Sequence, residues 1–368
     1  MTQTLKAPFP WFGGKSRIAG EVWARLGNVA NYVEPFFGSG AVLLARPHAP
    51  GTETVNDLDC YLANFWRAVK LHSGELAELA DYPVSEVDLT ARHGWLVRQT
   101  EFRTRMLADP EYYDVRVAAW WVWGLSSWIG DGWCAAAGNE RHGANAKPEN
   151  WRVRPNIKAS GGVQSKLPHL SHGEKGVYQK RPQLSQSAKG VVQQIPSISK
   201  AGNGITSKRP MLSDDGVGVI ARRRAGLAAW FEALAERLRE TRVACGDWRR
   251  VLTPAVTTHC RSTEKLTGVF LDPPYASADL GMRYSGGHEV TADNVREWAL
   301  AHGDNPMFRI ALCGYDGEHV MPGWECLPWK AAGGYGSGRG GRGEKNSRRE
   351  RIWFSSHCLK PDLLTWRE

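Results

Sequence analysis

The stretch "NYVEPFFGSGAVLLAR", residues 31–46, decides the fold of this chain. Residues 31–34 read as a short strand, a turn with two glycines follows, and residues 41–46 read as the start of a helix. A second strand that ends in acids (52–59) and a segment with apolar residues at helical spacing (60–72) come next. This alternation of strand and helix predicts an α/β domain with a mostly parallel sheet.

The same pattern returns after a long interval. Residues 221–248 have the composition of an amphipathic helix that leads into a strand. Further strands are predicted in "TGVFLDPPY" (267–275), "MFRIALCGYDGEH" (307–319) and "RERIWFSS" (349–356). The chain therefore reads as one α/β domain that a central insertion interrupts.

Composition excludes several classes of protein. Of 368 residues, 42% are hydrophobic, which is enough for a large core. No run is long and apolar enough to span a membrane, and the first residues lack the apolar region of a secretory signal. Seven cysteines without a C-x-x-C pair are typical of reduced intracellular thiols. We expect no metal site and a cytoplasmic location, in a bacterial or phage-infected cell.

A tryptophan-rich segment, residues 85–134, reads as helical. Trp120, Trp121 and Trp123 are expected in a buried helix. The tail "SSWIGDGW" (126–133) is polar and broken by glycine, so we expect it to form a surface loop. Trp128 in this loop is a candidate nucleic-acid contact.

The positive charge of the chain is concentrated in one segment. The net charge is +9, and residues 152–213 hold 11 of the 47 Lys and Arg residues but only one acid, Glu174. The rest of the chain is close to neutral, so a polyanionic partner is predicted for this segment. A basic insertion that only improves solubility is the alternative. Seven basic residues of the segment are candidate nucleic-acid contacts: Arg152, Arg154, Lys166, Lys180, Arg181, Lys208 and Arg209.

An internal repeat lies within the basic segment. Its prolines recur every 13 or 14 residues, each followed two positions later by Ile or Leu, and its glycines keep the same period. A fixed period indicates stacked units, and the Gly and Pro content favours short strands over helices. A flexible linker rich in Gly and Ser is the alternative. The repeated prolines are Pro155, Pro168, Pro182, Pro196 and Pro210.

Three groups of residues follow predicted strands, where α/β sheets bind ligands. Gly38 and Gly40 allow a sharp turn close to a ligand, and Asp57 can accept hydrogen bonds from a nucleoside. A tight turn and a helix cap would explain either of these features alone. "LDPPY" (271–275) is more specific, because Asp272 supplies a carboxylate and Tyr275 a ring face, which suit the amine of a flat heterocycle.

The order of four motifs gives a resemblance to a known family. "PWFGGK" (10–15), "VEPFFGSG" (33–40), "NDLD" (56–59) and "DPPY" (272–275) occur in the order found in Dam-like, D12 class DNA N6-adenine methyltransferases of the alpha type. "ALCGYD" and the closing "SRRERIWFS" are also similar to later strands of that family. The resemblance covers roughly residues 1–75 and 220–356, and the repeats are not part of it.

The resemblance implies a Rossmann-like fold and S-adenosylmethionine as cofactor. Trp11 and Lys15 would border this cofactor, Glu34, Phe36, Gly38 and Gly40 would line its methionine end, and Asp57 would hold its adenosine part. Asp272 would contact the adenine amine and the cofactor. The catalytic motif would comprise Asp272, Pro273, Pro274 and Tyr275, with the Pro273 carbonyl as an acceptor and Tyr275 as a stacking ring.

The implied activity is methyl transfer to N6 of a flipped-out adenine in DNA, by a protein that we expect to be a monomer. Cytosine-N4 methylation, RNA adenine methylation, or a nucleic-acid-binding protein with a vestigial methyltransferase core are the alternatives. An origin in a phage or a restriction–modification system is a hypothesis from the resemblance and the insertion. Four regions are predicted: an N-terminal core with the cofactor site (1–84), a helical target-recognition region (85–151), the basic repeats (152–219) and a C-terminal core with the catalytic motif (220–368).

Overall fold

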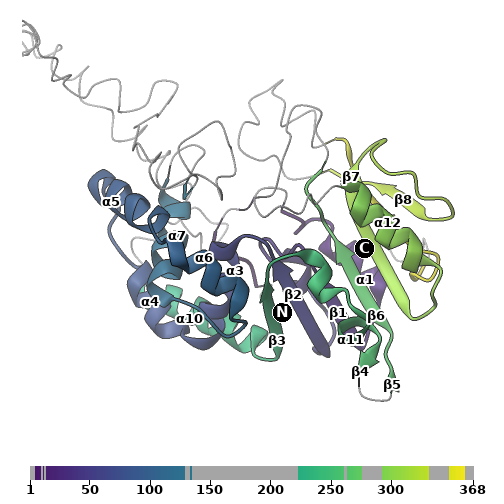
Figure 1. Ribbon diagram of the computed structural model, residues 1–368, viewed down its shortest axis with the longest axis horizontal. Coiled ribbons are helices and arrows are strands. Elements are labelled where there is room, and N and C mark those ends of the chain that lie inside the picture. Colours follow the sequence, from purple (N-terminus) through teal and green to yellow (C-terminus); the bar gives the residue numbers. More distant parts are fainter. Residues whose placement is uncertain are drawn as a thin grey trace, which may run out of the picture.

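The computed structural model describes residues 5–9, 11, 14–128, 133–134, 223–260, 263–275, 292–330 and 348–360. The repeats and the seven basic candidate residues lie outside these ranges. Within them the predicted α/β fold is confirmed (Figure 1). The strands are β1 (Asn31–Glu34), β2 (Thr52–Asp57), β3 (Thr241–Cys245), β4 (His259–Cys260), β5 (Thr263–Glu264), β6 (Thr267–Leu271), β7 (Phe308–Tyr315), β8 (Glu325–Pro328) and β9 (Glu350–Phe354).

Seven strands of the described residues form one sheet in the order β3-β2-β1-β6-β7-β9-β8. The strands from β3 to β7 are parallel, and β9 runs antiparallel to both β7 and β8. From β1 the chain passes first to β2, whereas β6 and β7 lie on its other side, so the strand order reverses between β1 and β6. Such a switch point leaves a crevice at the carboxyl ends of the strands, where α/β proteins bind ligands.

Helices cover both faces of this sheet. In Figure 1, α3 to α7 and α10 gather beside β3, while α12 lies by β7 at the other end. The helices of the first half are α1 (Ala19–Leu26), α2 (Ala41–Leu44), α3 (Cys60–Leu71), α4 (Ser73–Ala80), α5 (Glu86–Val97), α6 (Thr100–Ala108) and α7 (Val115–Ser127). Those of the second half are α10 (Arg223–Leu238), the 3₁₀ helix η5 (Trp248–Val251), α11 (Pro254–Thr257) and α12 (Ala292–Gly303).

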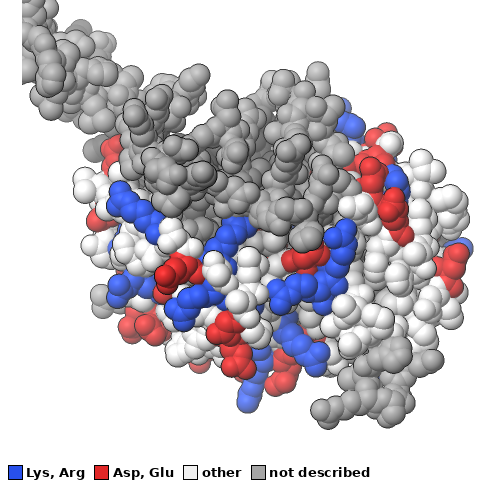
Figure 2. Space-filling model, viewed as in Figure 1, with Lys and Arg blue, Asp and Glu red and all other residues white. Residues whose placement is uncertain are grey.

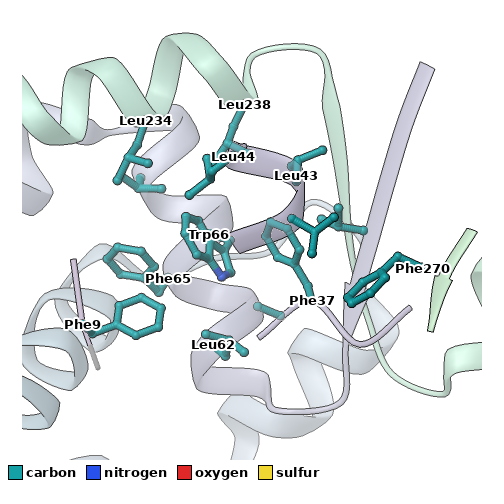
Figure 3. Close-up of a cluster of buried hydrophobic side chains, with 14 of the residues drawn as sticks. Phe9, Phe37, Leu43, Leu44, Leu62, Phe65, Trp66, Leu234, Leu238 and Phe270 are labelled. Atoms are coloured by element: carbon teal, nitrogen blue, oxygen red, sulfur yellow. The ribbon is translucent and has the colours of Figure 1, made fainter. Parts of the chain in front are cut away.

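The core consists of two apolar clusters, one on each face of the sheet. Alternate residues of β6 show the division: Phe270 belongs to the larger cluster, and Val269 and Leu271 belong to the smaller one. In the larger cluster, Trp66 of α3 lies at the centre, with the Phe37 ring 5.1 Å away (Figure 3). The loop after β1 is therefore anchored in the core by Phe37.

Helix α3 begins at the residue that its sequence indicates. The Asp59 carboxylate accepts hydrogen bonds from the backbone N–H groups of Tyr61 and Leu62, at 2.9 and 3.2 Å, and so caps the helix. Asp57 and Asp59 of "NDLD" consequently have different tasks, because only Asp59 is used as the cap.

The tryptophan-rich segment is helical, as expected, but its tail differs from the prediction. Trp121 and Trp123 are buried in α7, whereas Trp120 is half-buried. Ser126 and Ser127 were expected in a surface loop, yet both are buried in the last turn of α7. The Ser126 hydroxyl donates to the Val122 carbonyl at 2.8 Å, which lets a polar residue continue a buried helix.

Several described elements were not predicted, among them α1, α4, α12 and β8. Strand β8 lies at the edge of the sheet, its residues are exposed or half-exposed, and it ends at Pro328. It therefore lacks the alternation of apolar and polar residues that identifies a strand in a sequence. Among the described helices, none combines the length and the apolar composition needed to cross a membrane.

Candidate active site at the carboxyl edge of the sheet

The loop after β1 has a fixed backbone. Gly38 and Gly40 have φ of 51° and 64°, a region that residues with side chains rarely adopt. The Gly38 carbonyl accepts a hydrogen bond from Trp66 Nε1 at 3.0 Å, and the Pro35 carbonyl accepts one from Asn56 Nδ2 at 3.0 Å. Hydrogen bonds from Asn56 of β2 and Trp66 of α3 thus fix the backbone of this turn.

Trp11 covers the same loop. A Cβ atom on Gly38 would lie 2.8 Å from Trp11 Nε1, so the indole is in direct contact with the glycine backbone. Trp11 also packs edge-on against Phe9 with ring centroids 5.9 Å apart. Pro10, Phe12 and Gly13 of "PWFGGK" lie outside the described residues.

Asp57 projects from the end of β2 beside this loop. Its Oδ2 accepts a hydrogen bond from the Gly38 N–H at 3.0 Å, and its Oδ1 accepts one from the Asp59 N–H at 2.9 Å. Burial raises the pKa of Asp57 to about 7, against the opposing effect of these backbone donors. The carboxyl group is therefore oriented by the protein, and each oxygen retains a second lone pair for a ligand.

Glu34 ends β1 and is buried. Its carboxyl group accepts a hydrogen bond from the Tyr32 hydroxyl at 2.8 Å. Burial, and secondarily the charge of Asp272, raise the pKa of Glu34 well above its ordinary value. The Glu34 carboxyl group thus lies next to the site, but it is already hydrogen-bonded to Tyr32 of the same strand.

An aromatic pair that was not predicted lies near Asp57. The rings of Phe36 and Trp248 are 6.0 Å apart and inclined by 30°. Trp248 follows β3 through Gly246, whose N–H donates to the Asp57 carbonyl at 3.0 Å. The signal in the sequence is "CGDW" (245–248), in which an acid and an aromatic residue come directly after a strand, much as Asp57 stands at the end of β2.

Lys15 and Asp272 bring the first and last motifs together. Lys15 Nζ lies 2.8 Å from Asp272 Oδ2, and the two side chains are 6% and 20% exposed. Burial opposes the charge of Lys15, but the carboxylates of Asp272 and Glu350 outweigh it, so the pKa of Lys15 is raised. The lysine therefore carries its charge throughout the neutral range.

Tyr275 is the third member of the cluster that Lys15 and Asp272 form. Its hydroxyl lies 3.1 Å from Asp272 Oδ1 and 2.9 Å from Glu350 Oε2. Its ring is 5.2 Å from Lys15 Nζ and packs edge-on against Tyr315 with centroids 4.5 Å apart. Of the two prolines, Pro273 is buried and Pro274 is half-buried.

Glu350, Tyr315 and Trp329 were not predicted as site residues, and the fold adds them to this group. Glu350 starts β9 and pairs with Tyr315 of β7, and the ring of Trp329 lies 5.6 Å from Lys15 Nζ. The available signal was the similarity of "ALCGYD" and "SRRERIWFS" to later strands of the family, because these segments contain Tyr315 and Glu350.

Trp128 packs on α5 instead of joining this group. It follows α7 and stacks on His93 of α5, with ring centroids 5.3 Å apart. On the face that Figure 2 shows, Lys and Arg side chains lie among Asp and Glu side chains. Within the described residues no cluster of His, Cys, Asp and Glu could hold a metal ion.

Comparison with known families agrees with this geometry. No curated protein matches the chain. Residues 11–113 match the model of the D12 class N6 adenine-specific DNA methyltransferases, and this range contains Lys15, the loop after β1 and Asp57. In this range, which is less than half of the chain, the protein is accordingly similar to the D12 class N6 adenine-specific DNA methyltransferases.

Proposed function

We propose that the chain transfers a methyl group from S-adenosylmethionine to N6 of an adenine that is extruded from DNA. The observation that carries this proposal is the position of Asp57 and Asp272. Asp57 ends β2 and Asp272 follows β6, the two strands on either side of β1, so the two residues flank the switch point of the sheet. A donor on one side and an acceptor base on the other would meet between them.

The residues on the β2 side fit S-adenosylmethionine. Asp57 offers carboxylate lone pairs that suit the hydroxyl groups of a ribose, and its backbone donors orient them. The Phe36 and Trp248 rings provide faces for a purine. Gly38 lacks the Cβ that would meet Trp11, so backbone and indole can border a ligand together. When bound, S-adenosylmethionine supplies a methyl group on a positively charged sulfur.

The residues on the β6 side fit an adenine amine. Asp272 can accept a hydrogen bond from N6–H, and we assign the Pro273 carbonyl as the second acceptor. These contacts would turn the nitrogen lone pair, which is delocalised into the ring, toward the methyl group. Alignment of the two reactants contributes roughly 7–11 kcal/mol in favourable systems. Trp11 would stabilise the positive sulfur by roughly 0.5–2 kcal/mol through its ring face.

Direct transfer needs no nucleophile from the protein, because N6 of the adenine would itself bond to the methyl carbon as the bond from that carbon to sulfur breaks and the neutral thioether leaves. N6 would then lose one proton, and Asp272 would be the acceptor placed to take it. Cys313 lies close enough to Lys15 and Asp272 for their charges to affect its titration, and burial raises the pKa of its thiol well above the ordinary value. It stays a neutral thiol at neutral pH and is a poor nucleophile. We therefore assign no covalent role to it.

The amine of a paired adenine faces its partner base, so the substrate base has to leave the helix before it reaches Asp272. We assign target recognition to the region 85–151, of which α5 to α7 are described, and phosphate binding to the repeats of 152–219. We expect the enzyme to act as a monomer in the cytoplasm.

The test is a methylation assay with the purified full-length chain. Unmethylated duplex DNA is incubated with S-adenosylmethionine that carries a labelled methyl group, and the nucleosides are then separated. Label in N6-methyl-2′-deoxyadenosine from the DNA supports the proposal, with Asp272→Asn as the inactive control. Label in N4-methylcytosine or only in RNA would redirect it to one of the alternatives. DNA binding without transfer would indicate a vestigial core.

A further inference from the structure

The hydroxyl group of Tyr275 lies between two carboxylates. It is 3.1 Å from Asp272 Oδ1 and 2.9 Å from Glu350 Oε2. Burial, more than its acidic neighbours, raises the pKa of Tyr275 well above the ordinary value, so the hydroxyl keeps its proton at neutral pH. This single proton can be donated well to only one of the two acceptors at a time.

Asp272 has a second protein partner. Its Oδ2 lies 2.8 Å from Lys15 Nζ. If Tyr275 donates to Oδ1, both oxygens of Asp272 are engaged by the protein. An adenine amine would then have to share Oδ1 with the Tyr275 hydroxyl, and a carboxylate oxygen that already accepts one hydrogen bond is a weaker acceptor for a second one.

Glu350 offers the hydroxyl another acceptor in a fixed position. It is buried at the start of β9, where it pairs with Tyr315 of β7, and its carbonyl accepts a hydrogen bond from the Trp329 N–H at 3.1 Å. Tyr315, the strand partner of Glu350, packs its ring against the Tyr275 ring at 4.5 Å. Two paired strands thus hold Tyr275 at its ring and at its hydroxyl.

We propose that Glu350 is a positioning residue for methyl transfer, which accepts the hydrogen bond of the Tyr275 hydroxyl and so leaves Asp272 Oδ1 to the adenine amine. This inference rests on the proposed function and adds a residue to it. Glu350 acts through Tyr275 and has no contact with the substrate. Its carboxylate also favours the charge of Lys15, which keeps that lysine paired with Asp272.

The test is a double-mutant cycle between Glu350 and Tyr275, read by single-turnover methylation of DNA at saturating S-adenosylmethionine. Glu350→Gln keeps an oxygen that accepts from the hydroxyl, so its rate should stay within about threefold of the unmodified chain. Glu350→Ala removes the acceptor and should lower the rate at least tenfold. In the Tyr275→Phe background the same Ala substitution should change the rate less than about twofold, because the hydroxyl is already absent.

Controls separate positioning from folding. Glu325→Gln alters a carboxylate on the neighbouring strand that pairs with Arg25, and it should leave the rate unchanged. Thermal unfolding of every variant identifies losses that come from the sheet. Equal losses from Glu350→Ala in both backgrounds, or a normal rate in that variant, would overturn the inference. Absence of adenine methylation by the unmodified chain would instead overturn the proposed function.

Discussion

Lys15 Nζ lies 2.8 Å from Asp272 Oδ2, which joins the first motif of the chain to the strand end that carries "DPPY". The contact places a buried positive charge beside the carboxylate that we assign to the adenine amine. Because Lys15 is only 6% exposed, changes at Asp272 affect both the chemistry and the stability of this pair.

Asp272→Asn should therefore lose methyl transfer while the fold is retained. The amide has one acceptor oxygen, which Lys15 would occupy, so the hydrogen bond to N6–H is lost. We expect the single-turnover rate to fall about 100- to 1000-fold, by analogy with the removal of other transition-state contacts. Asp272→Ala should also lower the melting temperature, because it leaves Lys15 buried without this partner. A normal rate in the Asn variant would remove Asp272 from the amine site.

Binding of S-adenosylmethionine should strengthen as pH rises through about 7. The pKa of Asp57 in the free protein is raised to about 7, and the ionised carboxylate is the better acceptor for ribose hydroxyls. Below this value the proton has to leave on binding, so the affinity should fall up to about tenfold per pH unit. Titration calorimetry from pH 5.5 to 8.5 measures the effect.

Asp57→Asn supplies the control for this pH dependence. The variant should bind more weakly and show a flat profile over the same range. A profile that is equally steep in the variant would assign the titration to another group.

Gly38→Ala should weaken cofactor binding and lower stability. The residue has φ of 51°, and the new Cβ would lie 2.8 Å from Trp11 Nε1. Backbone strain of this kind costs about 1–3 kcal/mol. Denaturant unfolding and calorimetry report the two effects.

Gly20→Ala is the matched change for Gly38. Gly20 lies in α1, and a Cβ atom added to it would have nothing within 4 Å, so alanine should stabilise the helix by up to about 1 kcal/mol. If the two variants showed the same change in stability and in cofactor affinity, the contact between Gly38 and Trp11 would not contribute to either property.

Replacing the Lys and Arg residues of 156–213 with Gln should weaken DNA binding and reduce its salt dependence, while cofactor binding remains. This block holds nine Lys and Arg residues and one acid, Glu174, and it lies outside the described residues. If six of the cations meet phosphates, the slope of log K against log salt should change by roughly five units. Deletion of the block should give the same change.

A salt titration of DNA affinity for the three chains measures these slopes. Equal slopes would mean that the block does not contact the duplex, and a role as a linker or protein-binding element would then fit better. The block contains one aromatic residue, Tyr178, so we expect contacts to the backbone and little sequence discrimination.

Local signals allowed much of the fold to be predicted. β1, β2, β6 and α3 were found because each has a buried apolar run or a helical period next to a turn or cap. β8 and α12 were missed, and the burial of Ser126 was predicted wrongly. In these cases the environment is set by distant elements: α7, which contains Ser126, packs against α3 and α4, and β8 is placed by its pairing with β9.

The sequence by itself determined the parallel α/β order and placed Gly38, Asp57 and Asp272 at strand ends, because strand and helix periods are local and parallel strands expose their carboxyl ends at one edge. Only the tertiary structure decided which of these groups meet. The Lys15–Asp272 pair needs the chain before β1 to fold over β6, and the Tyr275–Glu350 contact needs the register in which Tyr315 of β7 lies opposite Glu350 of β9. Such contacts depend on the pairing of strands that are far apart in the chain, and no local pattern of residues encodes that pairing.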